Sequence, residues 1–193
     1  MEDRIFNINP LNKKIFVVDD FYTDPYKIRE FALNQEYYRD LNYFKGQRSR
    51  NRYLDDNIKL KFEEIIGQKI TVWEEHPMNG VFNVCSAEEN LVYHCDNQTF
   101  AGIIYLNIDP PYESGTSLLA NKRTGARHVD QITNFEECFS GGFYDKTKFD
   151  LVDNIGNVFN RLVIFDSKSI HSAAAYFGQN LDDSRLTHLF FFD

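Results

Sequence analysis

Beyond residue 68 the sequence is a succession of short runs rich in Val, Ile, Phe and Tyr, separated by Gly, Pro, Asn and Asp. Runs of this composition predict β-strands. Because no helical pattern lies between them, they favour an antiparallel sandwich or barrel. No other feature constrains the fold as strongly. The eight runs cover 69–75, 80–86, 91–96, 101–108, 117–122, 161–167, 169–175 and 185–193.

The first 68 residues have a different pattern. A β-prone run at 13–21 precedes a predicted helix at 24–35, in which Asp24 is the N-cap and Pro25 takes the first helical position. A second helix is predicted at 55–67, where apolar residues recur at helical spacing and Gly67 stands at the stop. We expect a single domain, in which 1–68 supply an N-terminal strand and helices and 69–193 form the β core.

Two loops interrupt this organisation. One, at 43–53, lies between the predicted helices and is basic. The other, at 121–150, is longer and contains one predicted helical turn, "NFEECF". Loops at the mouth of a barrel commonly carry specificity. We therefore expect the basic loop, together with 109–116 and part of 121–150, to frame a substrate entrance. The basic side chains concerned are Lys45, Arg48, Arg50 and Arg52.

Composition excludes several classes of protein. The chain has 21 basic and 29 acidic residues, a net charge of −8, which disfavours binding to nucleic acid. Its 3 cysteines have no Cys-x-x-Cys spacing, so neither a disulfide framework nor a thiolate zinc site is predicted. The sequence has no run of 18 apolar residues and no apolar segment near its start. We expect no association with a membrane, and a cytoplasmic location.

The run at 91–96 contains a histidine and an aspartate two positions apart, His94 and Asp96. In a strand such positions share one face, so the two side chains can converge. Another histidine, His171, lies in the run at 169–175. Two imidazoles and one carboxylate are the facial ligand set of non-haem ferrous iron. Arg185 opens the last run, where burial would be costly unless its guanidinium met an anion such as a carboxylate.

These motifs resemble the Fe(II)- and 2-oxoglutarate-dependent dioxygenases, most closely the prolyl-hydroxylase-like branch. The resemblance covers roughly 81–193. It rests on four segments in the family's order, "HCDNQTFAGIIYLNID", "SGTSLL", "NRLVIFDSKSIHS" and "SRLTHLFFFD". The chain departs from the family pattern at Ser114-Gly115, where a Gly-Gly pair is common. The segment between His171 and Arg185 is also longer than usual.

The resemblance implies a double-stranded β-helix, a jelly-roll or cupin-type barrel, in a mainly β (α+β) protein with the N-terminal helices packed on one sheet. It implies that His94, Asp96 and His171 bind Fe(II) and that Arg185 binds the distal carboxylate of 2-oxoglutarate, with O2 as the other cosubstrate. Tyr105 would assist this carboxylate and Thr187 could donate a hydroxyl to it. A carboxylate ligand at position 96 favours hydroxylation, because the halogenating relatives typically lack it.

The individual residues have other interpretations. Tyr105 is equally well explained as a core aromatic. Asp166 is better explained as a turn residue than as a partner of a metal ligand. His76 and His128 lack accompanying ligand residues, and His188 should face away from the cavity because it alternates with Arg185 and Thr187.

Two other functions remain open besides the oxygenase. One is a cupin-like protein that binds a metal or a small ligand without turnover. The other is a zinc hydrolase with the same ligands, which leaves Arg185 without a purpose. For the oxygenase, the resemblance makes a protein or amino-acid side chain our first expectation for the substrate, within the wider class of peptides, amino acids and small metabolites.

Overall fold

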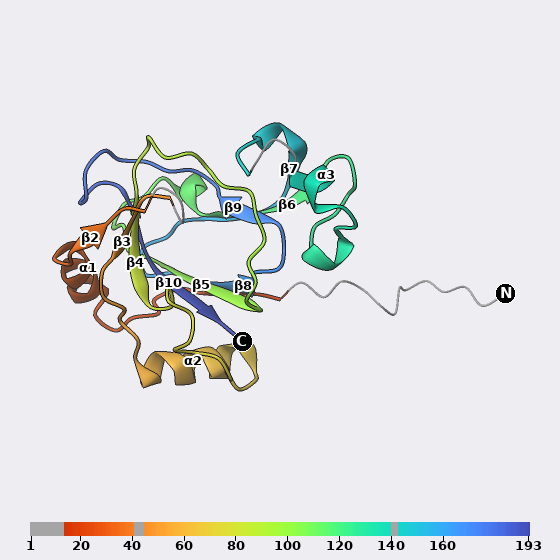
Figure 1. Cartoon of the computed structure of the whole chain (residues 1–193). Coiled ribbons are helices and arrows are strands. Elements are labelled where there is room, and N and C mark those ends of the chain that lie inside the picture. Colours follow the sequence, from red (N-terminus) through yellow and green to blue (C-terminus); the bar gives the residue numbers. More distant parts are fainter. Residues whose placement is uncertain (1–13, 41–44, 140–142) are drawn as a thin grey trace.

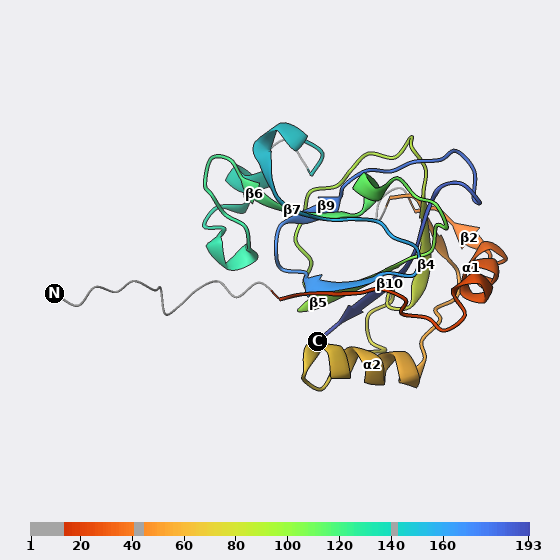
Figure 2. The ribbon, with the colours of Figure 1, turned by 180° about the vertical axis from the view of Figure 1, so that it is seen from behind.

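The computed structural model describes residues 14–40, 45–139 and 143–193, and consists of two antiparallel sheets that face each other (Figures 1 and 2). The larger sheet has seven strands, in the order β1 (Ile15–Val18), β8 (Leu162–Asp166), β5 (Phe100–Tyr105), β10 (Arg185–Phe192), β4 (Val81–Cys85), β3 (Gln47–Ser49) and β2 (Tyr37–Tyr38). The smaller sheet has three, in the order β7 (Phe149–Ile155), β6 (Thr116–Asn121) and β9 (His171–Ala173).

Both predicted N-terminal helices form, and both lie outside the larger sheet (Figure 1). In α1 (Pro25–Leu33), the Asp24 side chain accepts a hydrogen bond from the Lys27 amide, as expected of an N-cap. In α2 (Asp56–Ile66), Gly67 ends the helix in the left-handed conformation, at φ 72°. Ala32 of α1 and Phe62 of α2 are fully buried against the sheet, so the predicted packing of the helices on one sheet is confirmed.

The two faces of the larger sheet bury different sets of side chains. Its outer face forms an aromatic core under the helices, in which Phe62 contacts the rings of Trp73 and Phe190. Its inner face points toward the smaller sheet, where Leu118 joins Tyr105 and Phe165 in a second cluster. The alternation of side chains along each strand produces this division.

Six of the eight runs that were predicted as strands beyond residue 68 form strands, and two do not. The prediction for 69–75 is wrong because the amides of Thr71 and Val72 both bond to the carbonyl of Asp193, and the segment bends so that Trp73 enters the core. The prediction for 91–96 is wrong because the segment has only an isolated bridge, between His94 and His171. Its backbone amides bond to three separate parts of the chain.

Strands also form where loops were expected. Strand β3 lies inside the predicted basic loop, and β7 begins in the last two residues of the predicted loop at 121–150 and continues beyond it. Most residues of β7 are exposed, so this edge strand lacks the apolar alternation by which a strand is predicted. The predicted helical turn at "NFEECF" forms as α3 (Phe135–Phe139). The described residues also form three short 3-10 helices, at Tyr112–Ser114, Val129–Gln131 and Lys146–Lys148.

Within the described ranges, every helix is too short or too polar to cross a membrane.

Candidate metal centre and cosubstrate cavity

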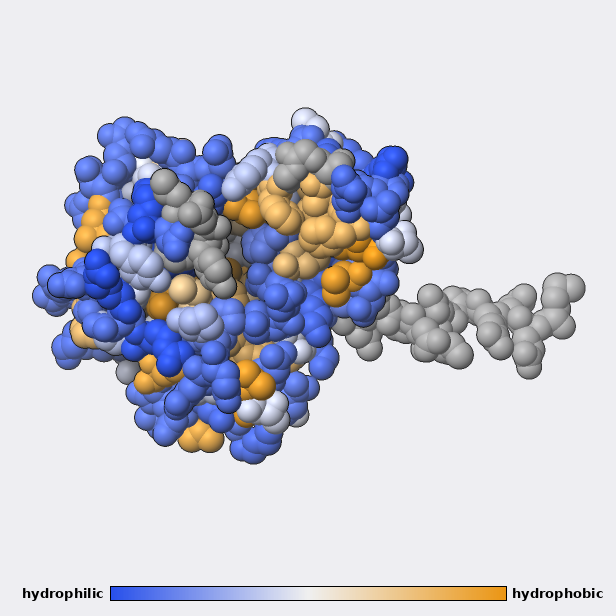
Figure 3. All heavy atoms as spheres, in the orientation of Figure 1, coloured by the Kyte–Doolittle hydropathy of each residue, from blue (hydrophilic) through white to orange (hydrophobic). Residues whose placement is uncertain are grey.

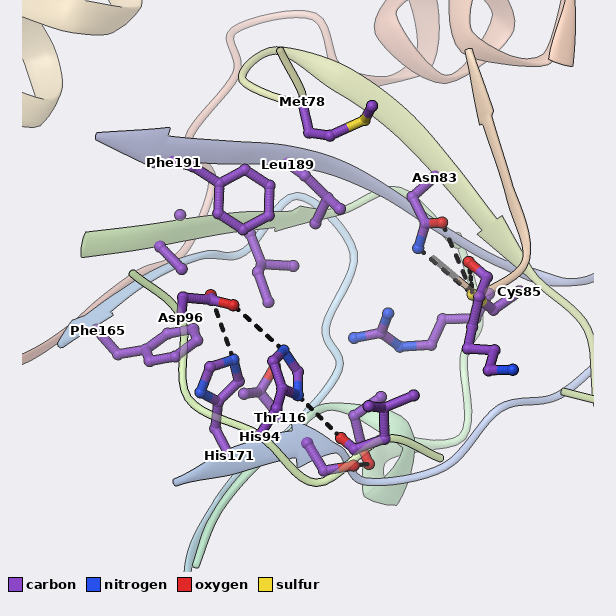
Figure 4. Close-up of a pocket in the computed structure, with 18 of the residues that line it drawn as sticks. Met78, Asn83, Cys85, His94, Asp96, Thr116, Phe165, His171, Leu189 and Phe191 are labelled. Carbon is purple, nitrogen blue, oxygen red and sulfur yellow. Dashed lines mark hydrogen bonds and ion pairs between the residues drawn. The ribbon is translucent and has the colours of Figure 1, made fainter. Parts of the chain in front are cut away.

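His94, Asp96 and His171 meet between the two sheets (Figure 4). The two imidazole centroids are 4.3 Å apart. Each Nε2 atom faces one oxygen of the same carboxylate, with 3.3 Å from His94 to Asp96 Oδ1 and 3.5 Å from His171 to Asp96 Oδ2. One ligand atom from each residue lies within 4.8 Å of the others, a spacing that a single metal ion can bridge.

Backbone carbonyls fix the orientation of both imidazoles. The Nδ1 atom of His94 lies 3.1 Å from the carbonyl of Val92, and that of His171 lies 2.8 Å from the carbonyl of Ser169. In each case the carbonyl accepts a hydrogen bond from Nδ1–H, so Nε2 is the nitrogen left to face Asp96 and a metal ion. Both Nε2 atoms are therefore ready to bind a metal. These carbonyls could not be predicted from the sequence, because every residue has a backbone carbonyl and its residue type does not show which carbonyl will accept a hydrogen bond.

The carboxylate is held in its ionised form. Burial alone would raise the pKa of Asp96, but the positive charge of His171 and hydrogen bonds from both imidazoles lower it well below its usual range. Burial opposes the charged form of His94, yet the hydrogen bond to Asp96 raises the pKa of that imidazole. The His171 side chain is 7% exposed and that of Asp96 is 17% exposed, whereas the 35% exposure of His94 leaves the centre open on one side.

Arg185 reaches the same space from the first position of β10 and is 3% exposed. Its Nε donates to the carbonyl of Ser114 at 2.9 Å and its Nη2 donates to that of Gly115 at 3.3 Å. Its guanidinium also lies 5.4 Å from the ring centre of Tyr105. These contacts orient the guanidinium at one end of the cavity.

Two further predicted residues lie next to Arg185. Tyr105 is fully buried, and its hydroxyl is 2.7 Å from Oγ1 of Thr116, so it packs in the core and also joins a polar group. Thr187 pairs with Tyr105 across the strands and is fully buried. Among the described residues, its Oγ1 has no hydrogen-bond partner. A buried hydroxyl without a partner costs free energy, so a bound acceptor would stabilise it.

A cavity of about 470 Å³ contains the His-Asp-His cluster and Arg185. This volume lies within the range of small-molecule sites. Figure 4 shows its two halves, with Met78, Leu189, Phe191 and Phe165 in one and Asn83 and Cys85 in the other. Several of these residues were not predicted from the sequence. Asn83 had a usable signal, since it is a polar residue inside the apolar run at 80–86, whereas Tyr176 and Met78 had none.

Of the four basic side chains expected at the substrate entrance, two line the cavity and two do not. Lys45 and Arg48 line the cavity. Arg50 and Arg52 are exposed and do not, because Arg50 pairs with Glu36 and Arg52 donates to the carbonyls of Glu74 and His76.

The long loop contributes two aromatic side chains to the cavity. Phe143 and Tyr144, from the loop at 121–150, line the cavity. Thr116, from the segment 109–116, lines it as well. Phe143 and Tyr144 are also 37% and 51% exposed, so they extend to the surface. Together with the exposed Phe135 of α3, Phe143 belongs to an apolar patch on an otherwise mostly hydrophilic face (Figure 3).

The remaining histidines have structural partners. His188 faces the outer core, as predicted, with Nδ1 2.8 Å from the hydroxyl of Tyr22 and Nε2 3.2 Å from the carbonyl of Gly80. His128 accepts from the amide of Asp130. His76 lines the cavity, and its Nδ1 accepts a hydrogen bond from the amide of Met78.

Asp166 is confirmed as a turn residue, because its side chain accepts from the Lys168 amide and its carbonyl from that of Ser169. It has a second contact, since its Oδ2 lies 3.4 Å from His128 Nε2.

The arrangement of strands is similar to that of several solved structures. HygX from Streptomyces hygroscopicus, solved with nickel and 2-oxoglutarate bound, has a TM-score of 0.59 at 11% identity, over 92% of this chain and 82% of HygX. A prolyl hydroxylase from Trichoplax adhaerens, in complex with a peptide fragment of the hypoxia inducible factor oxygen degradation domain, has a TM-score of 0.52 at 12% identity. That comparison covers 93% of this chain and 83% of the hydroxylase.

A third similar structure is the Fe(II)/α-ketoglutarate-dependent dioxygenase TqaL, with a TM-score of 0.46 at 12% identity over 92% of this chain and 82% of TqaL. No family model matches the sequence. No curated protein is significantly similar to it. The structural similarity confirms a mainly β, double-stranded β-helix. The resemblance to the Fe(II)- and 2-oxoglutarate-dependent oxygenases is thus confirmed at the level of the fold.

Proposed function

We propose that this protein is an Fe(II)- and 2-oxoglutarate-dependent oxygenase in which His94, Asp96 and His171 hold the iron. One observation carries the proposal. The Nε2 atoms of two imidazoles converge on the two oxygens of one carboxylate, while both Nδ1 atoms are engaged by backbone carbonyls. Two neutral nitrogen ligands and one anionic oxygen ligand suit ferrous iron.

The site of 2-oxoglutarate is proposed at Arg185. The guanidinium can bind the distal carboxylate through charge-assisted hydrogen bonds, and the buried Oγ1 of Thr187 supplies another donor. Tyr105 positions Arg185, since the guanidinium lies over its ring. The similarity of the fold to HygX, which was solved with nickel and 2-oxoglutarate bound, supports this assignment.

When bound, the iron supplies the oxidative chemistry, in which O2 and 2-oxoglutarate give succinate, CO2 and a hydroxylated substrate. The chain's own residues prepare the site. The Val92 and Ser169 carbonyls orient the imidazoles, and the lowered pKa of Asp96 keeps this carboxylate ionised and available to a metal. The apolar side chains of Phe165, Leu189 and Phe191 limit the access of water to one half of the cavity.

For the substrate, our first proposal is a protein or amino-acid side chain. The prolyl hydroxylase with a similar fold was solved in complex with a peptide, which supports this choice. We also place the protein in the cytoplasm, because Cys85, Cys95 and Cys138 are all free thiols, as a reducing compartment would keep them.

The proposal is tested by succinate formation. The wild-type protein, given Fe(II), 2-oxoglutarate and O2, should release succinate slowly even without substrate, through uncoupled turnover. Asp96→Ala should reduce both metal affinity and this turnover by at least about 100-fold, since loss of a ligand should exceed the effect of losing a residue that supports a ligand. Asp130→Ala is the matched control, because its carboxylate is exposed and outside the cavity.

Metal binding without any consumption of O2 would contradict the oxygenase. It would favour the second candidate, a cupin-like protein that binds a metal or a small ligand without turnover.

A further inference from the structure

A row of polar residues crosses four strands beside the cavity, and two of its members, Arg48 and Asn83, line the cavity. In the register of the larger sheet, Arg48 of β3 is opposite Asn83 of β4, Asn83 is opposite Thr187 of β10, and Thr187 is opposite Tyr105 of β5. Cys85 and Arg185 form the adjacent pair. The proposed 2-oxoglutarate site uses the β5 and β10 end of this row, and leaves the β3 end, at Arg48, without a role.

The opposite half of the cavity is apolar. It is formed by Met78, Ala101, Ile103, Phe165, Leu189 and Phe191. Phe165, Ala101 and Phe191 are consecutive partners in the sheet register, and so are Ile103 and Leu189. The iron ligands lie between the two halves, close to Phe165, as Figure 4 shows. A ligand that spans the cavity would therefore meet a polar end and an apolar end.

The charges in the cavity favour an anion beyond 2-oxoglutarate. Among the described residues that line it, Lys45, Arg48 and Arg185 are cationic and Asp96 is the one carboxylate. The lining side chains thus carry a net charge of about plus two. Binding of a ferrous ion and of 2-oxoglutarate does not change this net charge, because the two positive charges of the ion cancel the two negative charges of the dicarboxylate. Burial raises the pKa values of the Cys85 thiol and the Tyr176 phenol, so both are neutral at physiological pH.

Arg48 lies close to both proposed sites. The Nε and Nη1 atoms of Arg48 are shielded from solvent. Burial lowers its pKa and the charge of Arg185 lowers it further, but a guanidinium remains charged at neutral pH. Its charge also acts on His94. At the entrance, the Nζ of Lys45 is held 4.8 Å from the ring centre of Tyr144, which directs a second cation to this side of the cavity.

We propose that Arg48, with Lys45, binds a carboxylate carried by the substrate, while the apolar half of the cavity holds the carbon skeleton of that substrate beside the iron. The substrate is then a small acid with an apolar body. This inference rests on the proposed function, because the proposed iron ligands and Arg185 determine which part of the cavity remains for the substrate. Arg48 is the specificity-determining residue, and its planar fork matches a carboxylate.

The test compares 4-phenylbutanoate with its uncharged amide, 4-phenylbutanamide, by calorimetric titration of the protein loaded with Fe(II) and 2-oxoglutarate without O2. The acid should bind at least about 10-fold more tightly than the amide, as expected for a charge-assisted hydrogen bond. Arg48→Gln should remove this difference and Arg48→Lys should restore part of it. Arg50→Gln is the matched control and should change nothing, since Arg50 is exposed and lies outside the cavity.

The affinity for 2-oxoglutarate separates this inference from the proposed function. Arg48→Gln should bind 2-oxoglutarate as the wild type does. Equal binding of acid and amide, no saturable binding of either, or a loss of 2-oxoglutarate binding in Arg48→Gln would each overturn the role of Arg48. Failure of the wild type to bind 2-oxoglutarate would instead contradict the proposed function. In that case the acid and the amide would be titrated into Arg185→Gln loaded with Fe(II) alone. The acid should still bind at least about 10-fold more tightly than the amide, because the proposal assigns this preference to Arg48 and not to Arg185.

Discussion

The two faces of strand β10 differ in role, because the outer face packs in the core and the inner face borders the cavity. On the outer face, Leu186, His188, Phe190 and Phe192 are buried in or against the aromatic core under the helices. On the inner face, Arg185 and Leu189 line the cavity, and Thr187 lies between them along the strand. Every polar atom of the His188 imidazole has a protein partner, whereas Oγ1 of Thr187 has none among the described residues.

This difference separates a structural polar residue from one available to a ligand. His188 is enclosed by the hydroxyl of Tyr22, the carbonyl of Gly80 and two phenylalanine rings. Arg185 is oriented by two carbonyls, but it also lines a cavity. A histidine is a common metal ligand, yet here its position on the strand determines its role. If the comparison is right, changes on the outer face lower stability and changes on the inner face lower ligand affinity.

The largest effect is expected at Phe190. Phe190→Ala removes a fully buried ring that contacts those of Phe62 and Trp73, so the free energy of unfolding should fall by about 3–5 kcal/mol. Urea denaturation measures this change. Phe191, the neighbouring residue on the inner face, is only half-buried, so Phe191→Ala should lower the free energy of unfolding by less. Equal losses of stability in the two variants would remove the distinction between the faces.

The next largest effect is expected at Arg185. Arg185→Gln removes the proposed charge-assisted hydrogen bonds to 2-oxoglutarate, which should weaken its binding by about 1.5–3 kcal/mol. Calorimetric titration of the Fe(II)-loaded protein without O2 measures this affinity. Arg161→Gln is a suitable control, since that arginine pairs with Asp19 outside the cavity. Unchanged affinity in Arg185→Gln would move the cosubstrate site elsewhere.

His188 should make folding depend on pH. Burial lowers its pKa from 6.5 to about 3 in the folded protein. The stabilisation from the neutral imidazole is therefore fully present above pH 6.5 and is lost as pH falls toward 3, because the unfolded chain takes up the proton first. In this window His188 should contribute a slope of at most about 1.4 kcal/mol per pH unit.

Denaturation at a series of pH values, compared between the wild type and His188→Gln, isolates this contribution. The variant should have a shallower slope below pH 6.5. An identical slope in the two proteins would show that His188 accepts a proton without loss of the fold.

The smallest effect is expected at Thr187. Thr187→Val removes a buried hydroxyl that has no partner among the described residues, so the stability of the ligand-free protein should stay level or rise slightly. The affinity for 2-oxoglutarate should fall by about threefold to tenfold, the value of one neutral hydrogen bond. A gain in stability with no loss of affinity would remove Thr187 from the proposed site.

The sequence predicted β10 from its β-prone composition, and the period of two along a strand placed His188 on the face away from Arg185 and Thr187. The cap residues of the two helices were equally readable, since Asp24 and Gly67 act locally. The segment at 91–96 could not be predicted in this way. His94 and Asp96 converge because their amides bond to residues near His171, which are distant in the sequence.

The entrance of the cavity was harder to predict for the same reason. Arg48 and Arg50 belong to one basic run, and only the pairing of β3 with β4 puts the first of them inside. The proposed roles of the six site residues, the division of the chain at residue 68 and the substrate stay predictions.

The central claim is that one ferrous ion is shared by His94, Asp96 and His171, with 2-oxoglutarate extending from that ion to Arg185. A crystal soaked without O2 in Fe(II) and 2-oxoglutarate tests it directly. We predict density for an ion at about 2 Å from both Nε2 atoms and from an oxygen of Asp96, and a carboxylate of 2-oxoglutarate against the Arg185 guanidinium. An ion bound elsewhere, or a 2-oxoglutarate that does not reach Arg185, would contradict the account.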